Sequence, residues 1–433
     1  MSGPTASRDR RQPLLAPSHY LGNLARGASS LQIQPVDPIK FKGGVVAAPQ
    51  DMLDQSTLER VAALVRQGQP MPKLKVGGAM RAKQINERVS AMLSRQSDVR
   101  QIHEKGGYGP AWDEMARKID FPETAGSLLS LMASVRPGLF SQALLGAYLS
   151  SMLAWELRMT LKERLHAFLA GLLRDLGMLY VDPRLLDESA DQHFDGDAWT
   201  EVQAHVVVSA KIIDVLGMSN EVKNGVLCHH ERTDSTGYPR ALWGKDVPFI
   251  GQLVGFSDIA STLRVKRFFG SGRNLKDTLT VLQLNMDSFD GQIGQAFTEV
   301  LSRSKLKSTA FLPHDRETML RLLKRRATAI RQSMLQLQEV VEDRRAKNRS
   351  PKNHILRGSV DRTIHNLLRS GHSDNDFVWW LNLVAAGKEQ ADMHQLAEID
   401  LQQVELLWQV RRVRQELFKA VPSLAYRKNA VSI

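Results

Sequence analysis

The stretch HHERTDSTGYP, from His229 to Pro239, holds the densest group of reactive side chains in the chain. Two adjacent histidines, a glutamate and an aspartate place several groups that can bind a metal ion within about two helical turns. The Gly-Tyr-Pro tripeptide predicts the end of this helix and places Tyr238 beside whatever the histidines bind. Adjacent side chains of a regular helix point about 100° apart. We therefore expect His229 and His230 to serve a wide site with room for several ions.

Composition places this cluster in a globular protein with an excess of positive charge. The 433 residues include 58 Lys and Arg against 46 Asp and Glu, a net charge of +12 that favours anionic partners without choosing among them. The single cysteine, Cys228, excludes a disulfide framework and a cysteine-built metal site, and it favours the cytoplasm. The uncharged stretch 137–155 contains several Gly, Ser and Gln residues, so we expect a buried helix and no membrane span.

The pattern of apolar residues predicts a mainly α protein, with helices separated by short loops. Short extended pieces followed by a helix predict a small β-plus-helix accessory unit near the N-terminus, after a disordered basic arm. We expect the following organisation: a disordered arm at 1–30, the accessory unit at 31–70, a helical linker with a loop at 71–120, a helical domain at 121–310 and a helical extension at 311–433.

The segment 316–345 contains a short heptad pattern. Its apolar residues recur in steps of four and three, but the pattern lasts less than three heptads. Two interpretations are open at this point: the helix forms a homodimer contact, or it packs within its own chain. The residues concerned are Leu323, Ala327, Ile330, Met334, Leu337 and Val341.

The string at 229–239 resembles the HHExxDGxGYP signature of the HD-GYP family, which are cyclic-di-GMP phosphodiesterases built on an all-helical, metal-binding fold. Only Ser235 departs from it, where the family has glycine. LLRDLGMLYVDPRLL at 172–186 is similar to the family's LLHDIGKIGIPxxIL, and VPFIGQLVGFSDIASTL at 247–263 is similar to IPLxARILAVADVYDAL. The resemblance extends over residues 135–305 and implies an HD-GYP-like helical bundle in a bacterial signalling protein.

The resemblance also implies roles for individual residues and a divalent metal cofactor such as Mn or Fe. Paired ions in such a site lower the pKa of a bound water to about 7 and neutralise charge on the phosphoryl group. The implied metal ligands are Asp175, His205, His229, His230 and Asp258. The implied catalytic residues are Asp175, His229 and Glu231, and the implied ligand contacts are Arg174, Asp234, Tyr238 and Arg267.

Three positions depart from the family pattern. Arg174 stands where the family has the histidine of its HD pair, Met178 replaces a lysine, and spacing places Gln142 where the family has an upstream histidine. A guanidinium cannot donate an electron pair to a metal. At 4 Å and an effective dielectric of 20, its repulsion of a divalent ion is about 8 kcal/mol. We therefore expect Arg174 to neutralise Asp175 and Asp258 in place of one ion, which leaves one bound ion or none.

Three functions are consistent with this sequence. The first is a signalling protein with impaired hydrolysis that binds cyclic-di-GMP, a related phosphorylated nucleotide or a partner protein. The second is an active or partly active metal-dependent phosphodiesterase, and the third is a non-catalytic scaffold or a basic nucleic-acid-binding protein. Nucleic acid is disfavoured because no helix-turn-helix, zinc-finger or RNA-binding signature is present, and aromatic residues do not interleave with the basic ones.

Overall fold

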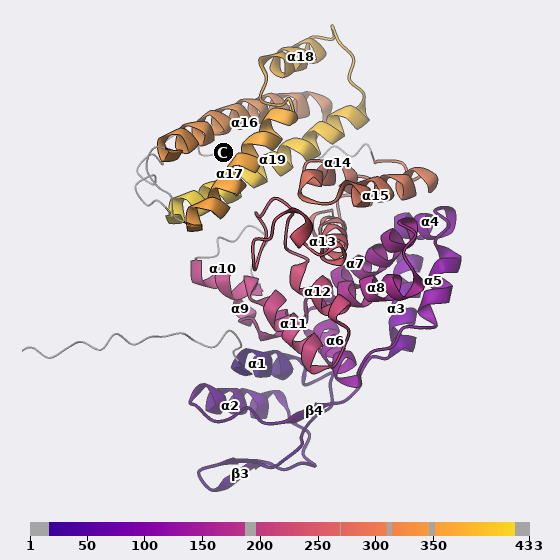
Figure 1. The fold of residues 1–433 in the computed structure, drawn as a ribbon, viewed down its shortest axis with the longest axis vertical. Helices are drawn as coiled ribbons and strands as arrows, with labels where there is room; N and C mark the ends of the chain where they lie inside the picture. Colours follow the sequence, from indigo (N-terminus) through magenta and orange to yellow (C-terminus); the bar gives the residue numbers. More distant parts are fainter. Residues whose placement is uncertain (1–16, 187–195, 269, 310–313, 346–350, 421–433) are drawn as a thin grey trace, which may run out of the picture.

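The computed structural model describes residues 17–186, 196–268, 270–309, 314–345 and 351–420. In this part of the chain the fold is mainly α, as predicted, and its β structure is limited to two small antiparallel pairs of strands. Figure 1 shows three parts along the long axis: an N-terminal unit at one end, a central helical bundle, and a helical extension at the other end.

The N-terminal unit confirms the predicted mixture of short strands and helices. Strand β1 (Ile33–Pro35) pairs with β4 (Leu74–Val76), and β2 (Ile39–Phe41) pairs with β3 (Gly44–Ala47). Helix α2 (Gln55–Arg66) begins after Asp54, whose carboxylate accepts the Thr57 N–H as an N-cap. Because β4 completes the ladder of β1, the unit extends beyond the predicted boundary at residue 70.

The prediction of a disordered arm over residues 1–30 is wrong for its second half, and residues 1–16 lie outside the described residues. Helix α1 (Pro17–Gly27) packs against α2 and α6 (Glu123–Val135). Leu21 and Leu24 are fully buried in the main core. These two leucines are three residues apart and so share a helix face. Burial of that face stabilises the helix, although the polar and glycine-rich composition of the segment did not indicate one.

The segment expected to be a helical linker contains α3 (Ala82–Arg95), α4 (Ser97–Lys105) and α5 (Gly109–Ala116). The loop expected within this segment is short, because α4 ends at Lys105 and α5 already begins at Gly109 with a proline in its first turn. Proline is tolerated there, since the first N–H groups of a helix have no intrahelical partner.

The central bundle is organised around α7 (Pro137–Glu156), which is buried on nearly all sides and packs against α8 (Leu161–Leu173) and α13 (Phe249–Thr262). The remaining elements follow in chain order as η1 (Leu176–Tyr180), α9 (Pro183–Leu186), α10 (Gly196–Gln203), α11 (His205–Val215), α12 (Asn220–Cys228), η2 (Gly244–Asp246), η3 (Leu263–Arg267), α14 (Thr278–Gln283), η4 (Met286–Ser288) and α15 (Gly291–Arg303). No described helix combines the length and apolar character needed to cross a bilayer.

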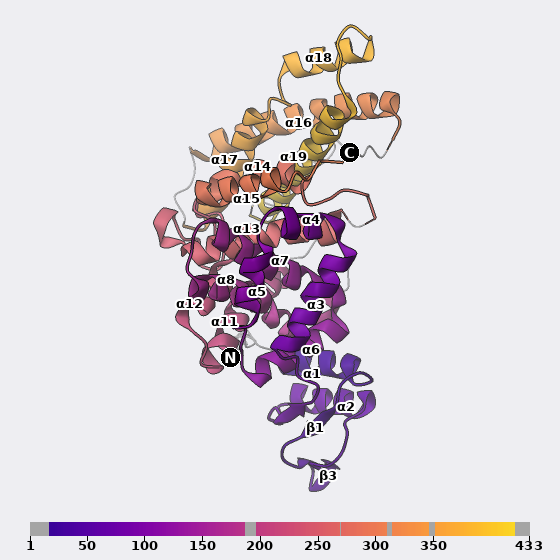
Figure 2. The same ribbon diagram turned by 90° about the vertical axis from the view of Figure 1, so that its right-hand side faces the viewer.

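The C-terminal extension consists of α16 (Arg316–Arg345), α17 (Pro351–Arg369), α18 (Asn375–Ala385) and α19 (Met393–Ala420). Figures 1 and 2 show it as a bundle at the end of the molecule opposite the N-terminal unit. Among the heptad residues of α16, Leu323, Ile330 and Leu337 are buried in cores shared with α17, α18 and α19, and Ala327 is buried as well. The heptad pattern is thus used within the chain, and it no longer supports the predicted homodimer through 316–345.

Acidification is expected to destabilise this extension through His372. The side chain is 4% exposed and stacks on Phe377, and burial lowers the pKa of His372 to about 4. Below the ordinary pKa near 6.5 the unfolded chain takes up a proton that the folded chain does not. The contribution of His372 to the free energy of unfolding is therefore fully present above pH 6.5 and decreases as the pH falls towards 4. At pH 5 the loss is about 2 kcal/mol.

Urea unfolding at pH 7 and pH 5 measures this effect when the protein is compared with His372→Phe, which cannot be protonated. We expect the variant to lose about 2 kcal/mol less stability between the two pH values. Equal losses in both proteins would contradict the assignment.

Candidate metal centre

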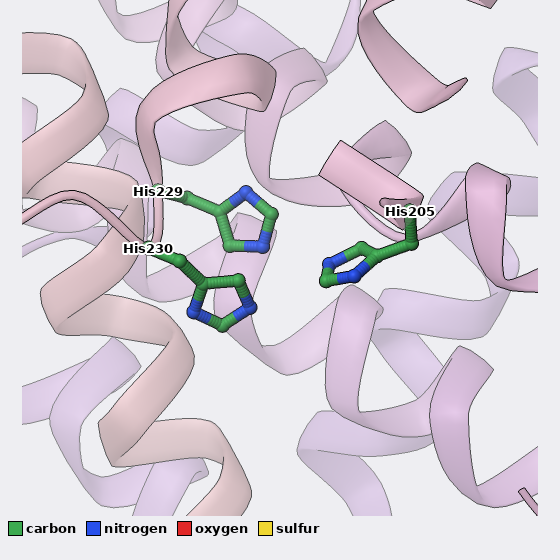
Figure 3. Close-up of side chains that lie close together, drawn as sticks. All are labelled: His205, His229 and His230. Carbon is green, nitrogen blue, oxygen red and sulfur yellow. The ribbon is translucent and has the colours of Figure 1, made fainter. Parts of the chain in front are cut away.

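Two separate segments of the central bundle bring three imidazoles together. His205 is the first residue of α11, and His229 and His230 directly follow the last residue of α12. One potential ligand atom from each of the three rings lies within 4.8 Å of the other two. Figure 3 shows the rings of His229 and His230 side by side, facing that of His205.

The convergence of His229 and His230 corrects the expectation of a wide site. Helix α12 ends at Cys228, so the two histidines lie in the turn that follows rather than in a regular helix. Their ring centroids are 4.0 Å apart. The 100° separation that a helix imposes does not apply in a turn, and both rings can face one ion.

Hydrogen bonds set the tautomers of the two fully buried histidines. Nδ1 of His205 lies 2.6 Å from the Val202 carbonyl oxygen, and Nδ1 of His229 lies 2.7 Å from the Val226 carbonyl oxygen. A carbonyl only accepts, so each Nδ1 carries the hydrogen and each Nε2 presents a lone pair. Both Nε2 atoms are buried without a hydrogen-bond partner. A backbone carbonyl on the far nitrogen is the usual support of a metal-binding histidine.

Asp175 adds a carboxylate to this group. Its Oδ1 lies 3.4 Å from Nε2 of His205 and 3.9 Å from Nε2 of His229. Burial, the largest influence, lowers the pKa of all three histidines, that of His229 to about 4, so the imidazoles are neutral at pH 7. A buried carboxylate that faces two lone pairs needs a cation between them. Three imidazoles and one carboxylate suit a borderline divalent ion such as Mn, Fe or Zn, so the residues present fit a metal.

A close approach between η1 and α11 holds Asp175 near His205. Gly177 packs against the backbone of His205, and a Cβ atom at this glycine would lie 2.2 Å from the His205 carbonyl oxygen. The Gly177 N–H also donates to the Ser209 hydroxyl at 2.7 Å. Glycine is required here because any side chain would push Asp175 away from the imidazoles.

Arg174 lies beside this group and is fully buried. Its Nη2 donates to Oδ1 of Asp258 at 2.7 Å, and its Nε lies 3.2 Å from Oδ2 of Asp175. Gly146 of α7 makes room for the guanidinium, since a Cβ atom there would lie 2.7 Å from Nη1. The structure thus places Arg174 against both carboxylates, as the sequence predicted.

The predicted contact of Arg174 with a bound ligand does not fit this geometry. The remaining donors of the guanidinium point to the backbone carbonyls of Gly171, Ala143 and Gln142. Each of its five N–H groups therefore has an acceptor within the protein, and none faces solvent.

Asp258 is bound by Arg174 and Gln142. The Gln142 amide donates to Oδ1 of Asp258 at 2.9 Å and to the Thr262 hydroxyl. Burial alone would raise the pKa of this carboxyl, but Arg174 and the neighbouring donors outweigh it and lower the pKa of Asp258 to about 2. Asp258 is therefore a carboxylate whose charge is already neutralised by a guanidinium.

Tyr238 forms one wall of the imidazole group. Its ring stacks on His230 at 4.7 Å and meets the edge of Trp199 from α10 at 6.1 Å. Burial raises the pKa of the Tyr238 hydroxyl, which therefore stays protonated. Ser235, in the same loop, has a φ of +58°, a conformation that glycine adopts without strain and that explains the family's preference at this position.

Two residues predicted to act in the site instead stabilise the loop around it. Glu231 is fully buried, and its two carboxylate oxygens accept the backbone N–H groups of Arg240 and Leu242. Asp234 accepts from the Thr236 N–H at 3.0 Å and pairs with Arg362 of α17 at 3.0 Å. These bonds do not support the catalytic role predicted for Glu231 or the ligand contact predicted for Asp234.

Arg267 is also placed differently from the prediction. Its Nη1 lies 2.6 Å from a carboxylate oxygen of Glu405 in α19. The guanidinium thus pairs with the C-terminal extension, which leaves no support for its predicted contact with phosphate.

Sequence reasoning missed three arginines and a tryptophan around the loop. Arg232 donates to the His229 carbonyl oxygen at 3.1 Å and stabilises the turn that presents both histidines. Arg412 of α19 lies over the ring of Trp199, and Arg362 pairs with Asp234. Arg232 lies within the quoted string and could have been considered. The two arginines of the extension lie over 120 residues away in sequence, and nothing in their local pattern indicates these contacts.

Comparison with known proteins shows what the segment that carries the site is similar to. The HD domain family model matches residues 127–293. The chain is 26% identical over 140 residues to 3′3′-cGAMP-specific phosphodiesterase 3 of Vibrio cholerae, covering 32% of this chain and 30% of that protein. It is 26% identical over 136 residues to a cyclic di-GMP phosphodiesterase of Pseudomonas aeruginosa, covering 31% of this chain and 32% of that protein. The chain thus spans about a third of the length of the curated relatives it matches.

A solved HDGYP protein from Bdellovibrio bacteriovorus is 16% identical, with a TM-score of 0.34 over 62% of this chain and 95% of that one. The matched stretch 127–293 includes every member of the imidazole and carboxylate group. Residues 127–293 of the chain, which carry the site, are therefore similar to HD domains.

Proposed function

We propose that this protein binds one divalent metal ion and a cyclic dinucleotide or related phosphorylated nucleotide, and that it hydrolyses phosphodiesters poorly. The observation that carries the proposal is the contrast between two neighbouring groups. Asp175 lies 3.4 and 3.9 Å from the buried Nε2 atoms of His205 and His229, which have no hydrogen-bond partner and present lone pairs to it. Asp258 already has its cation, because Arg174 donates two hydrogen bonds to it.

A divalent ion held by the three histidines and Asp175 would supply an activated water and neutralise charge on a phosphoryl oxygen. A second ion normally shares the task of stabilising the attacking and leaving oxygens. Here the fixed charge of Arg174 occupies the place of that second ion, but its donors are all directed into the protein. It therefore preserves the charge balance of the site without offering a binding position to the substrate.

Two features support a nucleotide as the ligand class. The curated relatives act on 3′3′-cGAMP or cyclic di-GMP by name, and the HD domain family model matches the stretch that carries the site. Tyr238 and Trp199 place aromatic rings next to the imidazoles, where a nucleobase would find an apolar surface.

A phosphodiesterase that works with a single ion is the second candidate, because the histidine and Asp175 group is complete for one ion. A role for the protein in bacterial signalling, its cytoplasmic location and a partner protein for its extension remain predictions from the sequence.

Metal analysis, calorimetry and a turnover assay test the proposal together. We expect about one tightly bound Mn or Fe ion per chain, measurable binding of cyclic di-GMP or 3′3′-cGAMP, and turnover well below about 1 per second. Two tightly bound ions per chain, or turnover typical of enzymes, would show that Arg174 does not replace an ion. Absence of both metal and nucleotide binding would favour the scaffold.

A further inference from the structure

A cavity of about 730 Å³ lies away from the imidazole group. It is bounded by α4, by the loop 268–274 and by the loop 304–309 that follows α15. None of its lining residues belongs to the metal centre; the one nearest in sequence to a member of that centre is Arg264, six residues beyond Asp258. Its size is that of an ordinary small-molecule site.

Hydrogen bonds between the walls fix the shape of this cavity. Gln101 of α4 donates to the Ser304 carbonyl oxygen at 3.0 Å, and Asn274 donates to the Lys307 carbonyl oxygen at 2.8 Å. Asp277 accepts from the Thr309 N–H at 3.0 Å and from its hydroxyl at 2.7 Å. The three segments are therefore joined to one another before any ligand arrives, which reduces the entropy lost on binding.

The lining carries an excess of positive charge. Arg264, Arg273, Lys305 and Lys307 contribute four positive charges, and Asp98 is the single acidic residue among the lining residues. Arg264 neutralises Asp98 through two hydrogen bonds, at 2.6 and 3.2 Å, and Arg273 pairs with Asp400 of α19 at 2.7 Å. In the part of the chain that the structure describes, Lys305 and Lys307 have no ion-pair partner and are exposed. Their charges are available to an anion.

The cavity offers charge and open backbone but no aromatic surface. Gly270 and Gly272 have φ angles of +72° and +75°, and a Cβ atom at Gly270 would meet nothing within 4 Å. Phe268 is 2% exposed, so its ring cannot stack on a nucleobase. A ligand here is recognised by its negative groups rather than by an apolar ring.

From this arrangement we propose that the cavity is a second ligand site, which binds the di- or triphosphate group of a small molecule. Lys305 and Lys307 supply charge-assisted hydrogen bonds and carry the uncompensated positive charge of the lining, since Arg264 and Arg273 are paired with Asp98 and Asp400. A diphosphate carries several negative charges and oxygens, which matches two exposed lysines that lie two residues apart on one side of the cavity. This site does not depend on the proposed function, because no group of the metal centre takes part.

Calorimetry of the full chain tests the proposal, with inorganic pyrophosphate as the probe. The protein is first freed of metal with a chelator and then exchanged into chelator-free buffer, so that pyrophosphate cannot bind through an ion at the histidines. The test variant is the double charge reversal Lys305→Glu with Lys307→Glu. Two variants serve as controls: the single charge reversal Lys211→Glu, and the double charge reversal Lys211→Glu with Lys40→Glu. Both lysines are exposed and lie outside the cavity.

We expect pyrophosphate to bind the wild-type chain and the control variants with affinities within about twofold of one another, and to bind the test variant at least tenfold more weakly. GTP in place of pyrophosphate is expected to give the same loss, since the phosphates are recognised. No binding to the wild-type chain, or equal affinity in the test variant, would overturn the proposal. Failure of the metal centre to bind an ion would leave this result unaffected.

Discussion

Replacing Arg174 with alanine is expected to lower the free energy of unfolding of the metal-free protein by about 3–5 kcal/mol. The guanidinium is fully buried and lies between the carboxylates of Asp175 and Asp258. Alanine leaves both carboxylates buried without a cation and also removes the hydrogen bonds to three backbone carbonyls. Urea unfolding in the presence of a chelator measures the loss.

Manganese is expected to restore much of this stability, and to do so more strongly in the variant than in the wild-type chain. The two carboxylates released by Arg174→Ala are hard oxygen ligands within reach of the imidazole group. An ion at 100 times its dissociation constant stabilises the folded state by about 2.7 kcal/mol. In the wild-type chain only the position at the histidines is available, so we expect a smaller gain.

Arg184→Ala is the matched control, because Arg184 pairs with Asp182 in the same domain but its side chain is 85% exposed. We expect this variant to change the free energy of unfolding by less than about 0.5 kcal/mol. An Arg174→Ala protein that is as stable as wild type without metal would show that the guanidinium does not neutralise the carboxylates. A variant that is destabilised but gains nothing from manganese would show that the vacated space is not a metal position.

The sequence was sufficient for the helical fold and for the list of groups near the metal centre, because those features depend on local patterns. The uncharged stretch 137–155 marks α7, and the family resemblance of the quoted strings brings Asp175, the histidines and Arg174 together. The pairing of Arg174 with carboxylates followed from charge alone, since a buried guanidinium and a buried carboxylate each need a partner.

The sequence failed where a side chain had two available partners. Glu231 and Asp234 are the types of residue that bind metals or ligands. In the structure, however, Glu231 accepts two backbone N–H groups and Asp234 pairs with Arg362. Arg267 was expected to meet phosphate, yet it pairs with Glu405. Local pattern cannot reveal that the C-terminal extension lies against the central bundle, because those contacts join residues over 120 positions apart.

The heptad pattern of α16 illustrates the same limit. A row of apolar residues indicates that a helix packs against a partner along one face. Which helix is that partner depends on the tertiary structure. Leu323 and Ile330 are buried by helices of the same chain. A homodimer contact and packing within the chain would each bury the same face of this helix, so the sequence could not distinguish them. The arrangement of α17 and α19 does.

His205→Ala is expected to weaken the binding of Mn or Fe by more than about 100-fold. His205 contributes a buried Nε2 lone pair from the opposite side of the cluster to His229 and His230, and its tautomer is set by the Val202 carbonyl. Loss of a residue that only supports a ligand already costs 10–100-fold in metal affinity. Loss of a ligand itself should cost more. Competition with a chelator of known affinity measures the change.

A buried imidazole also contributes packing, and His372→Ala is the control for that effect. His372 is comparably buried, at 4% exposed, but it lies in the C-terminal extension outside the cluster. We expect this variant to lose stability while its metal affinity stays within about twofold of wild type, whereas His205→Ala loses the metal even at temperatures where it is folded. If His205→Ala retained an ion with wild-type affinity, the ligand set of His205, His229, His230 and Asp175 would be wrong. The single-ion function built on it would then fail as well, because no other described group of three histidine, cysteine or acidic residues is gathered closely enough to hold an ion.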